Sequence, residues 1–282
     1  MEKRKISVPD IKARKNSGTP LTMLTAYDYP LALLADRAGT DMILVGDSLG
    51  MVVLGYPDTI SVTMDEMIHH IKAVSRAVKT ALIVGDMPFG SYNVSVEKAV
   101  ENANRIMKEG RADCVKLEGG GSMVQVAEAI VKSGTPVQGH IGLTPQTASA
   151  LGGFRVQGKS ADAAKALMED AKALEEAGCF SVVLEAIPAA IAQMITESVS
   201  IPTIGIGAGV HCDGQVLVMH DMVGLFERFT PKFVKQYAKI SETISGAIEE
   251  YIADVQNRRF PEEKHSFIMK KEELEKIRGE MA

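Results

Sequence analysis

The sequence contains few cysteines, no excess of basic residues and no long uncharged apolar run. Its three cysteines are an odd number and none forms a CxxC pair, so neither a disulfide framework nor a zinc site is expected. The formal net charge of −5 gives a nucleic-acid role no electrostatic support. We expect no transmembrane helix and no membrane partner. Because no apolar signal core follows the basic N-terminus, the predicted location is the cytoplasm.

Apolar residues make up 46% of the 282 positions, enough for a sizeable core. No linker divides the chain, so we predict a single domain over residues 1–282. Its core is expected at about residues 20–258, with a peripheral C-terminal tail at 259–282. Within this scheme the segment Pro231–Arg258 is predicted to form a long terminal helix, and the charged tail a peripheral helix or arm.

A short apolar run followed by a longer amphipathic segment recurs along the chain. The runs predict strands at Leu21–Ala26, Met42–Asp47, Ala81–Asp86, Asp113–Glu118, Pro136–Gly142, Phe180–Glu185, Pro202–Gly209 and Gln215–Asp221. Most are too continuously apolar for half-exposed strands and suit a parallel sheet buried on both faces. Apolar residues at helical spacing predict helices at Tyr29–Ala38, Met64–Val78, Val96–Glu109, Met123–Ser133, Ala161–Ala177 and Pro188–Ser198. This alternation predicts a (β/α)8 TIM barrel, with a doubly wound open sheet as the alternative.

Five of the predicted strands end on an acidic residue, and four of these acids are candidate site residues: Asp47, Asp86, Glu118 and Glu185. In a parallel barrel these residues would converge on the mouth at the carboxyl ends of the strands. Neighbouring carboxylates repel one another unless a cation neutralises them, and oxygen ligands favour Mg²⁺ or a similar ion. Asp47 and Asp86 are therefore predicted metal ligands, and Glu118 a third ligand or the holder of a water. The alternative is that each acid caps the following helix.

Two basic residues accompany these acids. Lys116 shares a strand face with Glu118, where it could form a Schiff base, hold an anionic substrate or pair with an acid. His140 could donate to a substrate or could be a hydrogen-bonded core residue. The glycine-rich segment 205–209 has two equally supported interpretations, a phosphate-binding loop or a tight strand-to-helix turn. His220 and Asp221 are predicted to be structural.

Several sequence blocks together resemble the ketopantoate hydroxymethyltransferase family. These blocks span about residues 20–230 in the family's order and are LTAYDYPLALLADRAG, GDSLGMVVLGYPDTISVTMDEMIHH, GDMPFGSY, VKLEGG, GHIGLTPQ, LEAIP and IGIGAGVHCDGQVLVMHD. The resemblance implies a barrel of the phosphoenolpyruvate/pyruvate type. It also implies transfer of a hydroxymethyl group from 5,10-methylenetetrahydrofolate to 3-methyl-2-oxobutanoate, giving 2-dehydropantoate for pantothenate biosynthesis.

The resemblance further implies a metal-stabilised enolate, Mg²⁺ or a similar divalent cation, and a homo-oligomer, expected to be a decamer. It assigns metal binding to Asp47, Asp86 and Glu118, and keto-acid binding to Asp47, Ser48, Asp86 and Lys116. It places His140 near the substrate and makes Glu185 the catalytic proton acceptor.

Three other functions stay open at this point. The nearest is a metal-dependent pyruvate-type aldolase or carbon–carbon lyase that works without folate. The second is a Schiff-base aldolase that uses Lys116, and the third is a non-catalytic ligand-binding barrel.

Overall fold

The computed structural model describes residues 4–150 and 152–281, and within them a closed barrel of parallel strands. The strands are β1 (Leu21–Thr25), β2 (Met42–Val45), β3 (Leu82–Asp86), β4 (Cys114–Lys116), β5 (Val137–Gly142), β6 (Ser181–Glu185), β7 (Thr203–Ile206) and β8 (Gly214–Leu217). Neighbours in the sequence pair in parallel, and β1 pairs with β8 to close the barrel. The predicted barrel is confirmed, and the open doubly wound sheet is wrong.

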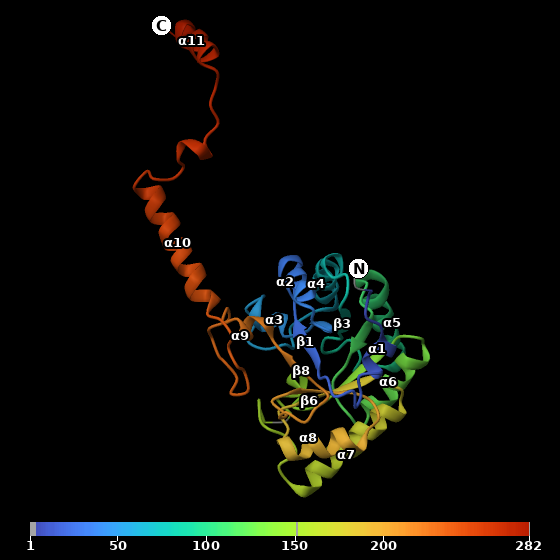
Figure 1. Cartoon of the computed structure of the whole chain (residues 1–282). Coiled ribbons are helices and arrows are strands. Elements are labelled where there is room, and N and C mark those ends of the chain that lie inside the picture. Colours follow the sequence, from blue (N-terminus) through green and yellow to red (C-terminus); the bar gives the residue numbers. More distant parts are fainter. Residues whose placement is uncertain (1–3, 151, 282) are drawn as a thin grey trace.

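Helices surround the barrel (Figure 1). Those that the sequence predicted are α2 (Tyr29–Ala38), α4 (Met64–Ala77), α5 (Val96–Arg105), α6 (Met123–Lys132), α7 (Ala161–Glu176) and α8 (Ala189–Ser198). A capping box begins α4, where Glu66 N donates to the Thr63 hydroxyl and Thr63 N donates to the Glu66 carboxylate. The predicted helix Val96–Glu109 continues beyond α5 as the π-helical turn η1 (Ile106–Gly110). Shorter elements that the sequence did not predict are α1 (Val8–Lys12), α3 (Leu49–Val52), and the 3-10 turns η2 (Pro145–Thr147) and η3 (Glu263–His265).

The N-terminal segment closes one end of the barrel. Ile11 of α1 is buried in the same apolar cluster as the inward-facing residues Met23, Met42 and Val84. The backbone N–H of Ile6 donates to the carbonyl of Thr80, directly before β3. The carboxyl ends of the strands lie at the opposite end, which is therefore the end left free for a functional site.

The last predicted strand is shorter than expected. β8 ends at Leu217, and the following residues form the short helix α9 (Met219–Met222). The backbone N–H of Met219 donates to the hydroxyl of Thr25, which turns the chain out of the sheet over the end of β1. His220 and Asp221 therefore lie on a helix, and the prediction that they end a strand is wrong.

The predicted terminal helix is also shorter than expected. The helix α10 covers Ile240–Gln256, not Pro231–Arg258. Residues 231–239 follow the barrel rim because they bond to α9: the N–H of Tyr237 donates to Met222 O, and that of Ile240 to Val223 O. These contacts hold the segment in turns, which a helical spacing of apolar residues does not reveal.

Residues 240–281 form a C-terminal arm that extends away from the barrel (Figure 1). The arm contains α10, η3 and α11 (Lys271–Glu280), and neither of its two helices has a buried residue. No helix in the described part of the chain is both long and apolar enough to cross a membrane. The division into a core at residues 20–258 and a tail at 259–282 stays a prediction.

Candidate active site

The predicted site residues line one cavity of about 480 Å³ at the carboxyl ends of the strands. Asp86 and Glu185 are the last residues of β3 and β6, and Lys116 is the last residue of β4. The prediction that Asp47 and Glu118 end strands is wrong in detail, because they lie two residues beyond β2 and β4. His140 lies inside β5. Side chains that far apart in the sequence meet because consecutive parallel strands end at one rim.

Lys116 and Asp86 form a buried ion pair at the base of this cavity. The ammonium nitrogen lies 2.9 Å from Asp86 Oδ1, and both side chains are at most 5% exposed. Burial lowers the pKa of Lys116, but the carboxylates of Asp86, Glu118 and Asp47 raise it more, so the net shift is upward. Lys116 is therefore held as a cation.

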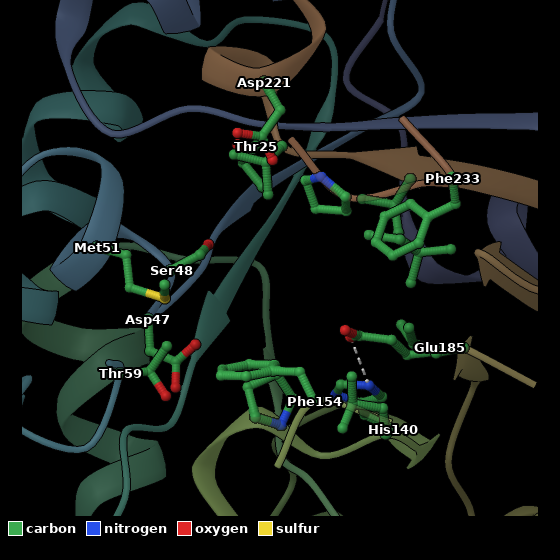
Figure 2. A pocket seen from close by; sticks show the side chains of 18 of the residues that line it. Thr25, Asp47, Ser48, Met51, Thr59, His140, Phe154, Glu185, Asp221 and Phe233 are labelled. Atoms are coloured by element: carbon green, nitrogen blue, oxygen red, sulfur yellow. Dashed lines mark ion pairs between the residues drawn. The ribbon is translucent and has the colours of Figure 1, made fainter. Parts of the chain in front are cut away.

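His140 lies between two carboxylates. Its Nδ1 is 3.3 Å from Glu118 Oε1, and its Nε2 is 3.1 Å from Glu185 Oε2, the pair joined in Figure 2. Burial and Lys116 lower the pKa of His140, but Glu118 and Glu185 raise it further, to about 9. Burial would raise the pKa of Glu118, yet His140 and Lys116 hold it below its usual range. At neutral pH the His140 ring is therefore a protonated imidazolium that lies between the carboxylates of Glu118 and Glu185.

Glu185 differs from the other acids in its surroundings. Its side chain is 15% exposed and faces the open cavity, whereas Asp86 and Glu118 are buried. The next residue, Ala186, has φ of 48°, a left-handed conformation that costs a non-glycine residue about 1–2 kcal/mol. This turn is held by hydrogen bonds from Ala186 N to Ile206 O and from Gln157 N to Ala186 O. The backbone therefore fixes the place from which Glu185 enters the cavity.

Asp47 is a buried acid that lies close to two other carboxylates. Burial raises the pKa of its carboxyl well above the usual value, and the charges of Asp86 and Glu118 raise it further. Its backbone N–H donates to Asp86 Oδ2 at 3.2 Å, so the two residues are adjacent. The neighbouring Ser48 hydroxyl lies 2.8 Å from the hydroxyl of Tyr27.

Gln146 and Tyr92 complete this network, and the sequence reasoning missed both. Gln146 Nε2 donates to Asp47 Oδ2 at 2.9 Å, and its backbone N–H donates to Glu118 Oε2 at 3.1 Å. The Tyr92 hydroxyl donates to Gln146 Oε1 at 2.6 Å and accepts from Glu118 N. Gln146 is the last residue of the block GHIGLTPQ, and Tyr92 is the last residue of the block GDMPFGSY. Their place in these family-like blocks was the only sequence feature that could have indicated a role in the site.

The acid cluster fits a divalent cation of the Mg²⁺ type. Asp47, Asp86 and Glu118 face only two cations, Lys116 and His140, so negative charge remains in excess. Among the described residues, no three Asp, Glu, His or Cys side chains are grouped as a complete metal site. Mg²⁺ commonly uses one or two carboxylates with waters and substrate oxygens, which suits the adjacent Asp47 and Asp86. The oxygens of Glu118 already bond to His140 and Gln146, which suits the role of holding a water.

The glycine-rich segment after β7 has a packing role. Gly207 has φ of 65°, and a Cβ there would lie 2.7 Å from the ring of Phe233. Phe233 lines the cavity, so the glycine allows the segment at residues 231–239 to close over the rim. Of the two readings that the sequence left open, the tight turn accounts for this glycine.

A solved structure shares this architecture. The structure of 2,3-dimethylmalate lyase, described as a PEP mutase/isocitrate lyase superfamily member, matches with a TM-score of 0.56 at 13% identity. The match covers 97% of this chain and 95% of that one. At this identity the likeness shows the fold alone, which is the predicted barrel.

Sequence comparisons are more specific. The model of the family described as ketopantoate hydroxymethyltransferase matches residues 5–263. The 3-methyl-2-oxobutanoate hydroxymethyltransferase of Carboxydothermus hydrogenoformans is 56% identical over 273 residues, covering 97% of this chain and 99% of the relative. The protein of the same name from Moorella thermoacetica is 59% identical over 266 residues, covering 94% and 99%. The chain therefore belongs to the ketopantoate hydroxymethyltransferase family.

Proposed function

We propose that this protein transfers a hydroxymethyl group from 5,10-methylenetetrahydrofolate to 3-methyl-2-oxobutanoate, giving 2-dehydropantoate for pantothenate biosynthesis. The observation that carries the proposal is the meeting of Asp47, Asp86, Lys116, His140 and Glu185 in one cavity. The names of the relatives give the substrate and the group transferred. The proposed location is the cytoplasm.

The keto acid binds at the base of the cavity. Lys116, held as a cation by Asp86, attracts the substrate's carboxylate and keto oxygen, and Ser48 offers a hydroxyl beside Asp47. Asp47 and Asp86 would hold Mg²⁺, and Glu118 a water beside it. When bound, this cation stabilises negative charge on the substrate's oxygens, a contribution of about several kcal/mol. The branched apolar end of the substrate faces cavity residues such as Leu44, Val183 and Val216.

Glu185 is the base in this proposal. The carbon next to the keto group is weakly acidic, and a positioned base accelerates its deprotonation by about 10²–10⁴-fold. Glu185 reaches the cavity from β6, on the opposite side of the cavity from Asp47 (Figure 2). The Nε2 atom of His140 lies 3.1 Å from Glu185 Oε2 and holds the Glu185 carboxylate in position. C3 loses its proton to Glu185 and bonds to the methylene carbon of the folate. Both bonds from that carbon to the folate nitrogens break, and one water supplies the new hydroxyl. The other proton of this water and the proton held by Glu185 replace the methylene carbon on the two nitrogens of the released tetrahydrofolate.

An assay of 2-dehydropantoate formation tests the proposal. The purified protein, 3-methyl-2-oxobutanoate and methylenetetrahydrofolate should give product with Mg²⁺ and none with excess EDTA. The same assay with formaldehyde in place of folate separates the nearest alternative, because an aldolase adds a free aldehyde to the 2-oxo acid and a carbon–carbon lyase catalyses the reverse cleavage. Product formation from formaldehyde that is as fast as that from methylenetetrahydrofolate would overturn the proposal in favour of that alternative.

A Schiff-base mechanism fits the cavity less well. A lysine must lose its proton before it can attack a carbonyl, and the carboxylates around Lys116 favour its protonated form. Treatment with borohydride and substrate should therefore leave the protein unlabelled. Covalent labelling of Lys116 would overturn this part of the account.

The C-terminal arm supports assembly into a homo-oligomer, which we propose is a decamer. Ile240, Ile244, Ile248 and Ile252 recur at helical spacing along α10 and are exposed. Exposed apolar stripes of this kind commonly mark protein–protein contacts, and a second copy of the chain is the proposed partner. Light scattering on the purified protein should give the mass of the oligomer, and a monomer at micromolar concentration would contradict this.

A further inference from the structure

Asp221 is a buried acid that the proposed chemistry leaves unused. It lies on α9, is 6% exposed and lines the same cavity as Glu185 and Asp47. In Figure 2 its side chain lies across the pocket from His140 and Phe154. The network of Asp47, Asp86, Lys116, Glu118 and His140 therefore does not account for it.

The carboxylate of Asp221 has no partner in the described part of the chain. Its Oδ1 is buried without a hydrogen bond, and no salt bridge to this residue is found among the described residues. Burial raises the pKa of this carboxyl to about 6. A buried polar group without a partner costs about 1–3 kcal/mol, more when it is charged. A carboxylate in this position is accounted for if a ligand with hydrogen-bond donors binds there.

Its neighbours give it no internal role. His220 beside it packs its ring against that of Tyr27, with centroids 5.3 Å apart. The hydroxyl of Thr25 instead accepts from Met219 N, and that of Tyr27 bonds to Ser48. These contacts fix α9 against β1 without using the carboxylate of Asp221.

The outer part of the cavity is aromatic. Phe154, Phe229 and Phe233 all line it, and all three remain exposed at its opening. Exposed phenylalanines around a cavity suit the faces of a flat aromatic ligand. The full volume of about 480 Å³ also lies within the range of pockets for drug-sized ligands, so a small keto acid fills only part of it.

We propose that Asp221 and the phenylalanine rim form the folate pocket, and that the Asp221 carboxylate accepts hydrogen bonds from the pterin's 2-amino group and N3–H. This proposal rests on the proposed function and adds to it the recognition of the cosubstrate. The edge of the pterin presents two parallel N–H donors, and a carboxylate accepts such a pair with both oxygens. The keto acid then occupies the base of the cavity, and the one-carbon unit lies between the two ligands.

The first test compares Asp221→Asn with the wild type and with Glu227→Gln. Glu227 is an exposed acid in the segment that follows α9 and does not line the cavity, so it is the matched control. In Asp221→Asn, KM for methylenetetrahydrofolate should rise about 10-fold to 100-fold, the loss of one charged hydrogen-bonding pair. Glu227→Gln should match the wild type. An unchanged KM in Asp221→Asn overturns the proposal.

The second measurement follows exchange of the C3 proton of 3-methyl-2-oxobutanoate into heavy water without folate. Asp221→Asn should keep the wild-type exchange rate, because this half-reaction does not use the pterin. If exchange falls in parallel with turnover, Asp221 serves the keto acid and the folate pocket is wrongly placed. If the wild type itself neither exchanges nor forms 2-dehydropantoate, the proposed function fails instead.

A ligand analogue separates recognition from structural damage. Calorimetry would compare tetrahydrofolate with its 2-desamino analogue on the wild type and on Asp221→Asn. The analogue should bind the wild type about 10-fold or more weakly, and this difference should largely vanish in the variant. An equal penalty in both proteins overturns the assignment, whatever the stability of the variant.

Discussion

The barrel mouth buries charged side chains, whereas the C-terminal arm exposes apolar ones. At the mouth, Asp86, Lys116 and Glu118 are each at most 4% exposed, and each has an oppositely charged neighbour. On the arm, Ile248 and Tyr251 are 53% and 57% exposed and α10 has no buried residue. Both arrangements oppose the usual distribution of polar and apolar groups. At the mouth these three charged side chains pair with one another or with His140, whereas the apolar residues of α10 are not buried by any described part of the chain.

This contrast predicts different consequences of substitution. Changes at the mouth should alter chemistry or ion binding while the assembly persists. Substitutions on the arm should alter the oligomeric state, while proton exchange of the keto acid at the barrel mouth should continue.

The largest expected effect is that of Glu185→Gln. Exchange of the C3 proton of 3-methyl-2-oxobutanoate into heavy water should fall by about 10²–10⁴-fold, because the amide cannot accept the proton. Nuclear magnetic resonance follows this exchange, and the mass of the oligomer should be that of the wild type. Undiminished exchange would remove Glu185 from the role of base.

Asp86→Ala should cost about 100-fold or more in turnover with Mg²⁺ present, since the cation's contribution is several kcal/mol. The variant also leaves Lys116 buried without its nearest partner, and removing one partner of a buried pair costs about 3–5 kcal/mol of stability. Asp86→Asn is the gentler companion, because it keeps the shape of the side chain. Full activity in either variant with Mg²⁺ would refute the assignment of this residue to the metal.

Gln146→Ala should weaken binding of the divalent cation by about 10-fold to 100-fold, the usual effect of losing a group that orients a metal ligand. Its amide holds Asp47, and its backbone holds Glu118. Calorimetry with Mg²⁺ measures the change. Gln193→Ala is the control, because the side chain of this half-buried glutamine on α8 bonds to Glu197 and to no other described residue. Equal affinities in the two variants would show that Gln146 does not position the ligands.

The smallest effect on chemistry is expected from the arm. Ile244→Ser combined with Ile248→Ser should lower the mass of the oligomer, because burying one isoleucine contributes about 1.5–3 kcal/mol. Proton exchange of the keto acid should continue. Glu249→Ser, on the same helix, is the matched control. An unchanged oligomer measured by light scattering would contradict a role for this stripe in assembly.

A stability prediction lies away from both regions. Asp36 accepts hydrogen bonds from the backbone N–H groups of Lys79, Thr80 and Ala81. Burial raises its pKa, but these bonds lower it more, so the net shift is downward. Asp36→Ala should lose about 2–4 kcal/mol in denaturant unfolding. A depressed pKa means that this contribution is present at neutral pH and is lost as pH falls through the folded-state value. A variant as stable as the wild type at pH 7 would show that these bonds contribute nothing.

The barrel could be predicted from the sequence because its strands are buried on both faces. Runs such as Met42–Val45 and Leu82–Asp86 are continuously apolar up to the residue that faces the mouth. The acids then followed from the end of each run, although the exact offset of Asp47 and Glu118 from the strands did not. Their roles stay predictions, since proximity in a cavity does not distinguish a metal ligand from a substrate ligand.

The remaining features depend on contacts between distant residues. Gln146 donates a hydrogen bond to Asp47 although the two residues are 99 positions apart in the sequence, and no local sequence pattern predicts that contact. Asp221 was placed on a strand because Gln215–Asp221 is apolar, whereas a bond from Met219 to Thr25 ends the strand early. The terminal helix was predicted to begin at Pro231, whereas bonds from Tyr237 to Met222 and from Ile240 to Val223 delay its start to Ile240. In each case a tertiary contact decided the outcome.

One measurement tests the central claim that the mouth is built to remove a proton from the keto acid. It is the exchange of the C3 proton of 3-methyl-2-oxobutanoate into heavy water by the wild-type protein without folate, with Mg²⁺ and then with excess EDTA. The account predicts rapid exchange with Mg²⁺ and its loss with EDTA. No exchange with Mg²⁺, or exchange that EDTA leaves unchanged, would contradict it.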